Sequence, residues 1–135
     1  SKSQIKEWKS IIGIEFIEPR RDIENVYKKV DCVVLPSYRE GMPKTLLEAG
    51  SMGLPAVATN VPGCRNIIQD NVNGFLCRAK DARDLEQAMI KALNLSRNDY
   101  EKMGINARNI VENNFDEKIV IDSALDALNS ILKNN

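Results

Sequence analysis

The chain has 135 residues, enough for one domain with its own core, and its 43% hydrophobic and 28% charged residues are ordinary for a globular protein. Its formal net charge is zero, which argues against a nucleic-acid-binding surface, because neutralising phosphates requires a basic excess. Histidine is absent, which excludes Ser-His and Cys-His catalysis and any histidine-ligated metal.

The three cysteines, Cys32, Cys64 and Cys77, are odd in number and show no C-x-x-C spacing. This pattern disfavours a disulfide framework and a zinc site. No apolar run approaches the ~18 residues that a membrane span requires, and no signal peptide opens the chain. We therefore expect a cytoplasmic protein.

The first third of the chain alternates between predicted helices and strands. A weak helical pattern over residues 4–11 precedes a short predicted strand at Ile14–Ile17, which Pro19 ends. Asp22 is a suitable N-cap for a helix that we expect to run through Val30. The continuous apolar run Cys32–Leu35 is typical of a parallel strand that is buried on both faces.

Glycine, proline and capping residues divide the rest of the chain. Further buried strands are predicted at 56–58 and 74–77, with about one helical turn between them. Three more helices are predicted from their first residues, with Asp81 and Ser96 as N-caps and Asp116 at the start of the last. The alternation indicates an α/β fold with a parallel Rossmann-like sheet and flanking helices.

The stretch from Pro36 to Gly53 is the candidate site. A polar loop leads from a buried strand into a helix that we expect to have Pro43 at its first position and Gly53 just past its end. The next amides, of Lys44, Thr45 and Leu46, are then expected to lack intrahelical acceptors and to face the positive end of the helix dipole. A diphosphate matches such a helix start.

Two carboxylates bracket this helix start. Glu48 lies just over one turn into the helix, and helical side chains lean toward the N-terminus, so its carboxylate can accept hydrogen bonds from ribose hydroxyls. Glu40 precedes the helix and can accept from a second polyol, such as a sugar, while Gly41 allows close approach of the backbone. The pattern predicts a nucleotide-sugar pocket; the alternative is two ordinary surface acids at a solvated helix start.

The segment from Glu40 to Ala49, EGMPKTLLEA, resembles the E-x7-E motif of family 4 glycosyltransferases, which are retaining enzymes of the GT-B fold. The resemblance runs from about Ile14 to Phe115. The segment from Val61 to Arg65 is similar to members that build bacterial capsule, exopolysaccharide and lipopolysaccharide chains. The resemblance implies transfer of a hexosyl unit from a nucleotide diphosphate sugar to a glycan or lipid-linked acceptor.

The resemblance also implies roles for the matching residues. Glu48 would bind the ribose, and Glu40 would lie against the donor sugar near the reacting carbon. The backbone groups of Gly41, Met42 and Pro43 would line the sugar. Lys44, Thr45 and Leu46 would lie at the diphosphate. The loop with Glu18, Pro19 and Arg20 would lie beside the nucleotide base. The resemblance implies no metal ion, because basic side chains and the helix end meet the phosphate charge in this family. It also implies no cofactor, because the UDP- or GDP-linked sugar is a substrate.

The chain departs from the family pattern in extent. The resembled enzymes have two domains, and residues 1–135 match only part of the C-terminal, donor-binding one, without its first strands. We therefore expect a fragment that is inactive alone, and we expect the N-terminal half to hold the acceptor. Peripheral attachment to the inner face of the membrane is expected for a lipid-linked acceptor. Unpaired strand edges are expected to lead to self-association. The final helix is expected to leave Leu125, Leu128 or Leu132 uncovered. Asn66 stands where members often carry glutamate.

Other readings remain open from the residues. A GT-B-like epimerase shares the pocket, and so does a non-catalytic nucleotide-sugar-binding or assembly module. A phosphorylase is disfavoured because we find no candidate for its cofactor lysine. A receiver-like domain is disfavoured because its acidic cluster is absent, and no loop fits a flavin.

Overall fold

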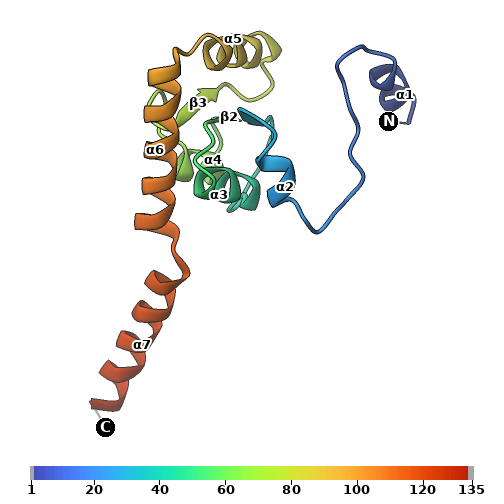
Figure 1. Ribbon diagram of the computed structural model, residues 1–135. Helices are drawn as coiled ribbons and strands as arrows, with labels where there is room; N and C mark the ends of the chain where they lie inside the picture. Colours follow the sequence, from blue (N-terminus) through green and yellow to red (C-terminus); the bar gives the residue numbers. More distant parts are fainter. Residues whose placement is uncertain (1, 134–135) are drawn as a thin grey trace.

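The computed structural model describes residues 2–133 of the chain (Figure 1). Its helices and strands are, in chain order, α1 (Lys2–Lys9), α2 (Glu24–Tyr27), β1 (Val33–Leu35), α3 (Lys44–Ser51), β2 (Ala56–Thr59), α4 (Pro62–Ile67), β3 (Gly74–Cys77), α5 (Ala82–Leu93), α6 (Arg97–Phe115) and α7 (Glu117–Lys133).

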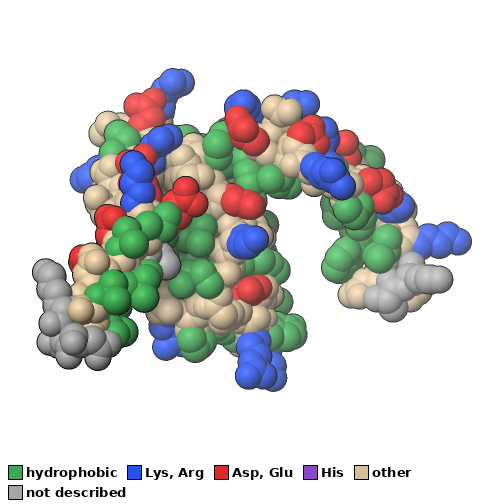
Figure 2. Space-filling model, turned by 90° about the horizontal axis from the view of Figure 1, so that it is seen from below, with side chains coloured by type: hydrophobic (Ala, Val, Ile, Leu, Met, Phe, Trp, Pro, Cys, Tyr) green, Lys and Arg blue, Asp and Glu red, His purple; other side chains and the backbone are tan. Residues whose placement is uncertain are grey.

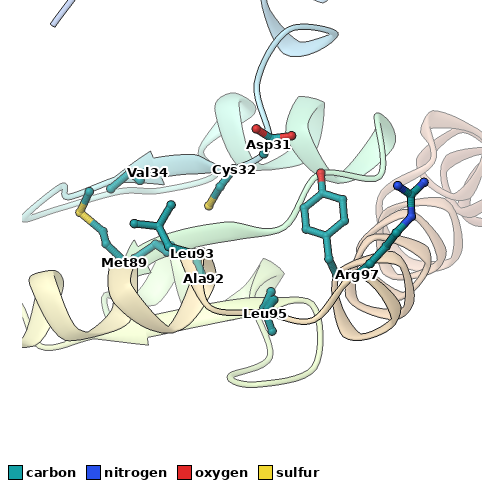
Figure 3. Close-up of a pocket in the computed structure, with 10 residues that line it drawn as sticks. Asp31, Cys32, Val34, Met89, Ala92, Leu93, Leu95 and Arg97 are labelled. Atoms are coloured by element: carbon teal, nitrogen blue, oxygen red, sulfur yellow. The ribbon is translucent and has the colours of Figure 1, made fainter. Parts of the chain in front are cut away.

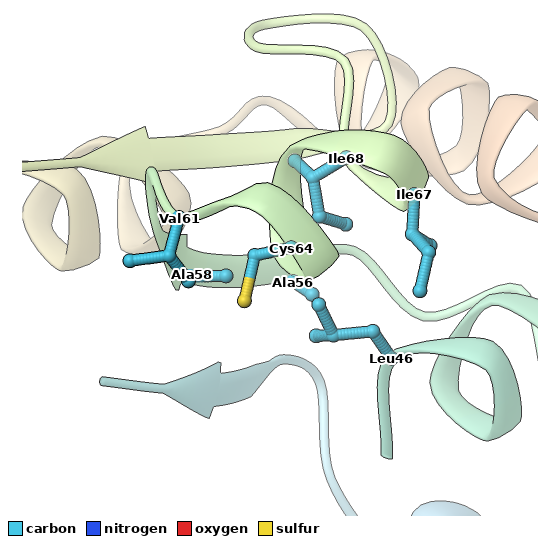
Figure 4. Close-up of a cluster of buried hydrophobic side chains, with 7 residues drawn as sticks. All are labelled: Leu46, Ala56, Ala58, Val61, Cys64, Ile67 and Ile68. Atoms are coloured by element: carbon cyan, nitrogen blue, oxygen red, sulfur yellow. The ribbon is translucent and has the colours of Figure 1, made fainter. Parts of the chain in front are cut away.

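The three strands form a parallel sheet in the order β1-β2-β3, with Val33 beside Ala56 and Val57 beside Phe75. The central strand, β2, is buried along its whole length. Successive side chains of β2 point to opposite faces of the sheet, so Ala56 and Ala58 belong to one hydrophobic cluster and Val57 to another. Helices α3 and α4 cover one face, and α5 and α6 cover the other. The first cluster, shown in Figure 4, contains Leu46, Ala56, Ala58, Val61, Cys64, Ile67 and Ile68.

The helix boundaries predicted at Gly53, Asp81, Ser96 and Asp116 are confirmed. Gly53, at φ 70°, follows α3 in the left-handed conformation, and the amide of Leu54 donates to the carbonyl of Ala49 at 2.9 Å, as in a Schellman motif. Asp81 accepts from the amide of Asp84 at 3.0 Å and so caps α5. The equivalent contacts start α6 at Ser96 and place Asp116 directly before α7.

Helix α6 is packed closely against α3, and glycine makes this possible. A β-carbon on Gly50 would lie 2.6 Å from Cγ2 of Val111, and one on Gly104 would collide with the carbonyl oxygen of Gly53. Nη1 of Arg108 also donates to the carbonyl of Ser51 at 3.1 Å, at the end of α3. These contacts fix α3, and therefore the candidate site, against α6.

Two segments extend beyond the sheet and its helices. Figure 1 shows α1 apart from the sheet at one end and α7 continuing away from α6 at the other. Hydrophobic side chains are visible on both segments in Figure 2. The expectation of an uncovered final helix is confirmed, since Leu125, Leu128 and Leu132 are 52%, 57% and 72% exposed.

The predicted strand at Ile14–Ile17 is wrong. These residues are irregular and exposed, and β1 pairs only with β2, so they do not pair with Val33. A strand needs a neighbour for its backbone groups, and an apolar pattern alone does not supply one. The described sheet therefore has three strands instead of four, and β1 lies at its edge. The prediction that this strand is buried on both faces is also wrong, since Val34 in β1 is 37% exposed.

The predicted helix from Asp22 to Val30 is also corrected. Helix α2 has a single turn, and Ile23 occupies the N-cap position without a side-chain hydrogen bond. The Asp22 carboxylate instead binds the guanidinium of Arg20, with 2.6 Å between Nε and Oδ1. Both carboxylate oxygens of Asp22 accept hydrogen bonds from Arg20 instead of from a backbone amide in the first turn of α2.

Two kinds of feature are absent from residues 2–133. No described helix is both long and apolar enough to cross a membrane. No group of acidic, cysteine or histidine side chains in the same residues is arranged to hold a metal ion.

Candidate functional site

The start of α3 lies one residue later than the sequence predicts. Pro43 has φ −72° and ψ 106° and takes the N-cap position, so Lys44 is the first helical residue. The amide of Leu46 donates to the carbonyl of Pro43 at 3.0 Å, and the Leu46 side chain is 1% exposed in the core. The prediction that the Leu46 amide is a free donor is therefore wrong. The amides before the first helical hydrogen bond are those of Lys44 and Thr45.

The loop before α3 is held against α4. The amide of Gly63 donates to the carbonyl oxygen of Glu40 at 3.2 Å. At the last residue of β2, the hydroxyl of Thr59 donates to the carbonyl of Ser37 in the same loop. Both contacts tie the loop to the carboxyl end of β2, the edge at which parallel α/β sheets bind their ligands.

Glu40 is half-buried beside the start of α4, whereas Gly41 and Met42 after it are exposed. Burial raises the pKa of the Cys64 thiol, and the negative charge of Glu40 raises this pKa further. The loop thus presents an acidic side chain and a glycine backbone next to the start of α3.

Glu48 has a partner that the sequence did not predict. The hydroxyl of Tyr27, on α2, donates to Oε2 of Glu48 with 2.9 Å between the oxygens. The Tyr27 ring is 7% exposed and belongs to a small cluster with Ala49 and Leu54. Tyr27 lies within the helix predicted from Asp22 to Val30, and a buried tyrosine hydroxyl needs an acceptor, which was the available signal. The sequence does not specify an acceptor 21 residues away.

The predicted base-binding residues Glu18, Pro19 and Arg20 lie in the exposed segment between α1 and α2. Arg20 lines a cavity of about 280 Å³ together with Ile17 and Val26. The guanidinium is already paired with Asp22, which raises the pKa of Arg20 through a hydrogen bond and opposite charge. Placement of these residues beside a nucleotide base stays a prediction.

A cavity of about 630 Å³ lies on the other face of the sheet (Figure 3). Strands β1 and β2, helix α5 and the start of α6 supply its mostly apolar lining. Its polar groups are Asp31, Arg97 and Tyr100, and burial followed by the charge of Asp31 raises the pKa of the Tyr100 hydroxyl. None of the predicted site residues lines this cavity, so the sequence-based site and this cavity are separate.

The described geometry defines a class of protein: a parallel α/β sheet with a polar loop and a helix start at its carboxyl edge, where sheets of this kind bind ligands. Comparison with known proteins defines it further. The model of the family described as glycosyl transferases group 1 matches residues 2–110. The chain therefore belongs to this family, and its fold is part of the Rossmann-like C-terminal domain of a GT-B enzyme.

Two relatives illustrate the similarity. The chain is 36% identical over 98 residues to the UDP-Gal:alpha-D-GlcNAc-diphosphoundecaprenol alpha-1,3-galactosyltransferase of Escherichia coli, covering 69% of this chain and 25% of the relative. It is 30% identical over 125 residues to the N,N'-diacetylbacillosaminyl-diphospho-undecaprenol alpha-1,3-N-acetylgalactosaminyltransferase of Campylobacter jejuni, covering 90% of this chain and 32% of the relative.

A solved structure agrees with the fold. A glycosyltransferase from Rickettsia africae ESF-5 superposes with a TM-score of 0.89 at 28% sequence identity, over 99% of this chain and 36% of that one. The chain thus spans a quarter to about a third of the length of the proteins it matches.

Proposed function

We propose that the chain is the donor-binding part of a glycosyltransferase. The enzyme would transfer a hexosyl unit, with retention, from a UDP- or GDP-linked sugar to a glycan or lipid-linked acceptor. One observation carries the proposal: Glu40 and Glu48 flank the start of α3, whose first two amides precede the helical hydrogen bonds. The names of both relatives support it, since each includes a diphospho-undecaprenol acceptor, and one includes UDP-Gal.

The parts of the donor have different chemistry, and the residues match it part by part. The diphosphate is anionic and suits the amides of Lys44 and Thr45 together with the Lys44 ammonium. The ribose offers vicinal hydroxyl donors, which suit the Glu48 carboxylate. The sugar suits Glu40 and the Gly41 backbone.

The same groups suit the reaction. Transfer breaks the bond between the sugar and the diphosphate, so negative charge grows on the leaving diphosphate. The helix start and Lys44 would stabilise this charge without a metal ion. Glu40, near the reacting carbon, would stabilise positive charge that develops on the sugar ring. The acceptor would be bound outside this chain, and a lipid-linked acceptor would place the enzyme at the inner face of the membrane.

Calorimetric titration with UDP, GDP and their glucose conjugates tests the proposal. The Glu48→Gln variant keeps the size of the side chain and removes its charge. It is expected to weaken nucleotide binding about tenfold, because a hydrogen bond to a charged group contributes about 1.5–3 kcal/mol. Glu86→Gln, at an exposed position of α5, is the matched control. Equal binding by all three proteins would contradict the proposal, and so would a parent chain that binds neither UDP nor GDP.

A further inference from the structure

The Tyr27–Glu48 contact joins two elements that are far apart in the chain. Tyr27 is on the single turn α2, and Glu48 is in the second turn of α3. The Tyr27 ring is buried against Ala49 and Leu54, so its position is fixed by packing with α3 itself. The tyrosine is therefore a rigid support, since only two side-chain torsions position its hydroxyl.

The hydrogen bond restricts Glu48 without neutralising it. Within residues 2–133, Glu48 takes part in none of the ion pairs, and a neutral hydroxyl leaves the carboxylate its full charge. The contact uses one lone pair on Oε2 and leaves Oε1 and the remaining lone pairs for other donors. A glutamate side chain otherwise has considerable rotamer freedom, and its loss on binding weakens affinity.

We propose that Tyr27 is a positioning residue that holds the Glu48 carboxylate in the orientation that accepts the ribose hydroxyls of the donor nucleotide. This inference rests on the proposed function and extends it to a residue outside the E-x7-E segment. In this role Tyr27 acts through Glu48 and needs no contact of its own with the nucleotide.

The protonation state of Tyr27 agrees with this role. Burial, followed by the hydrogen bond to Glu48 and its negative charge, raises the pKa of Tyr27 to about 12. The hydroxyl therefore remains a donor over the whole physiological pH range, and the support does not switch with pH.

A tyrosine titration tests the contact without a ligand. The absorbance of tyrosinate is followed from pH 8 to 13 in the parent chain, in Tyr27→Phe and in Glu48→Gln. The Tyr27→Phe titration identifies which of the three tyrosines is Tyr27. The inference requires the Tyr27 pKa to fall in Glu48→Gln, because that variant removes the charge that helps to raise it. An unchanged Tyr27 pKa would show that the contact does not form, and would overturn the inference.

A comparison of ribonucleotides with deoxyribonucleotides tests the role. UDP and GDP are titrated alongside 2′-deoxy-UDP and 2′-deoxy-GDP. The ratio of the two affinities reports the ribose hydroxyl alone. Tyr27→Phe is expected to lower this ratio about threefold to tenfold, the effect of one hydrogen bond. Tyr100→Phe removes a half-buried hydroxyl from the other face of the sheet and should leave the ratio unchanged.

The outcomes separate this inference from the proposed function. If the parent chain prefers the ribonucleotide, Glu48→Gln abolishes the preference and Tyr27→Phe does not lower it, the inference fails and the proposed function stands. Equal loss of both affinities in Tyr27→Phe indicates a purely structural role and also overturns the inference. If the parent chain shows no preference for the ribonucleotide, the role of Glu48 in the proposed function fails, and the inference fails with it.

Discussion

The amide nitrogen of Gly63 lies 3.2 Å from the carbonyl oxygen of Glu40, and the two are joined by a hydrogen bond. A β-carbon on Gly63 would lie 2.6 Å from that same oxygen and would also collide with the carbonyl of Gly41. The start of α4 and the loop that carries Glu40 can approach this closely only because residue 63 is glycine.

The Gly63→Ala variant is expected to lose stability and donor binding together. The added methyl group meets backbone atoms, which cannot rotate away as a side chain can, so the Glu40 loop must shift. We expect the free energy of unfolding to fall by about 1–3 kcal/mol, as in other overpacked sites. Urea unfolding measures the stability, and calorimetry with a UDP- or GDP-linked sugar measures the binding.

Gly41→Ala is the matched control for stability. A β-carbon on Gly41 has nothing within 4 Å, and its φ is not in the left-handed region. Its free energy of unfolding should therefore stay within about 0.5 kcal/mol of the parent value. If Gly41→Ala and Gly63→Ala destabilise the chain equally, the close contact between α4 and the loop is not the cause.

The contact between α3 and α6 predicts a compensating pair of substitutions. In Gly50→Ala, the new methyl group would lie 2.6 Å from Cγ2 of Val111. We expect a loss of about 1–3 kcal/mol in stability, and a smaller loss when Val111→Ala has already removed that methyl group. A double-mutant cycle by urea unfolding measures the coupling. Strictly additive effects would show that the two residues do not limit each other.

Stability is expected to fall in acid partly through Asp84. The amide of Arg78 donates to its carboxylate at 2.6 Å, and this hydrogen bond, followed by the Arg78 charge, lowers the pKa of Asp84 against the effect of burial. A group with a lowered folded-state pKa stabilises the fold above its unfolded-state pKa, and this contribution is lost as the pH falls through the folded-state value.

The measurement is the melting temperature between pH 7 and pH 2.5. The parent chain should lose stability below about pH 4, near the ordinary pKa of an aspartate. Asp84→Asn cannot titrate, so its melting curve should depend less on pH over that range. The nearby exposed Glu86→Gln serves as the control. An identical pH dependence in the parent chain and Asp84→Asn would refute the assignment.

Self-association remains a prediction of the exposed surfaces. The edge of β1 carries unpaired backbone groups, and Leu125 and Leu128 expose more than half of their surface on α7. The mass measured by light scattering should rise with concentration, and Leu125→Ser with Leu128→Ser should reduce this rise. A monodisperse monomer at every concentration would rule the prediction out.

The sequence predicted those parts of the fold that depend on neighbouring residues. Asp81 and Ser96 cap helices through amides three residues away, and Gly53 ends α3 through its own φ. The buried strand β2 was predicted correctly for a related reason, since a short run of small apolar residues before a turn has few other arrangements.

The sequence failed where a distant residue decides the outcome. Ile14–Ile17 has the side chains of a strand, but no neighbouring strand pairs with it in the described sheet. Asp22 can cap a helix, but it binds Arg20 instead. In the candidate site the sequence predicted both carboxylates and the helix, but the Tyr27–Glu48 hydrogen bond spans 21 residues and depends on how α2 packs against α3.

A nucleotide titration followed by amide NMR tests most directly whether the start of α3 holds the donor diphosphate. With UDP or GDP, the amides of Lys44 and Thr45 should shift most, and they should saturate together with that of Gly41. The Leu93 and Tyr100 amides, at the cavity on the opposite face, should not move. Shifts confined to Leu93, Tyr100 and their neighbours, or no shifts with millimolar concentrations of either nucleotide, would contradict the proposed site.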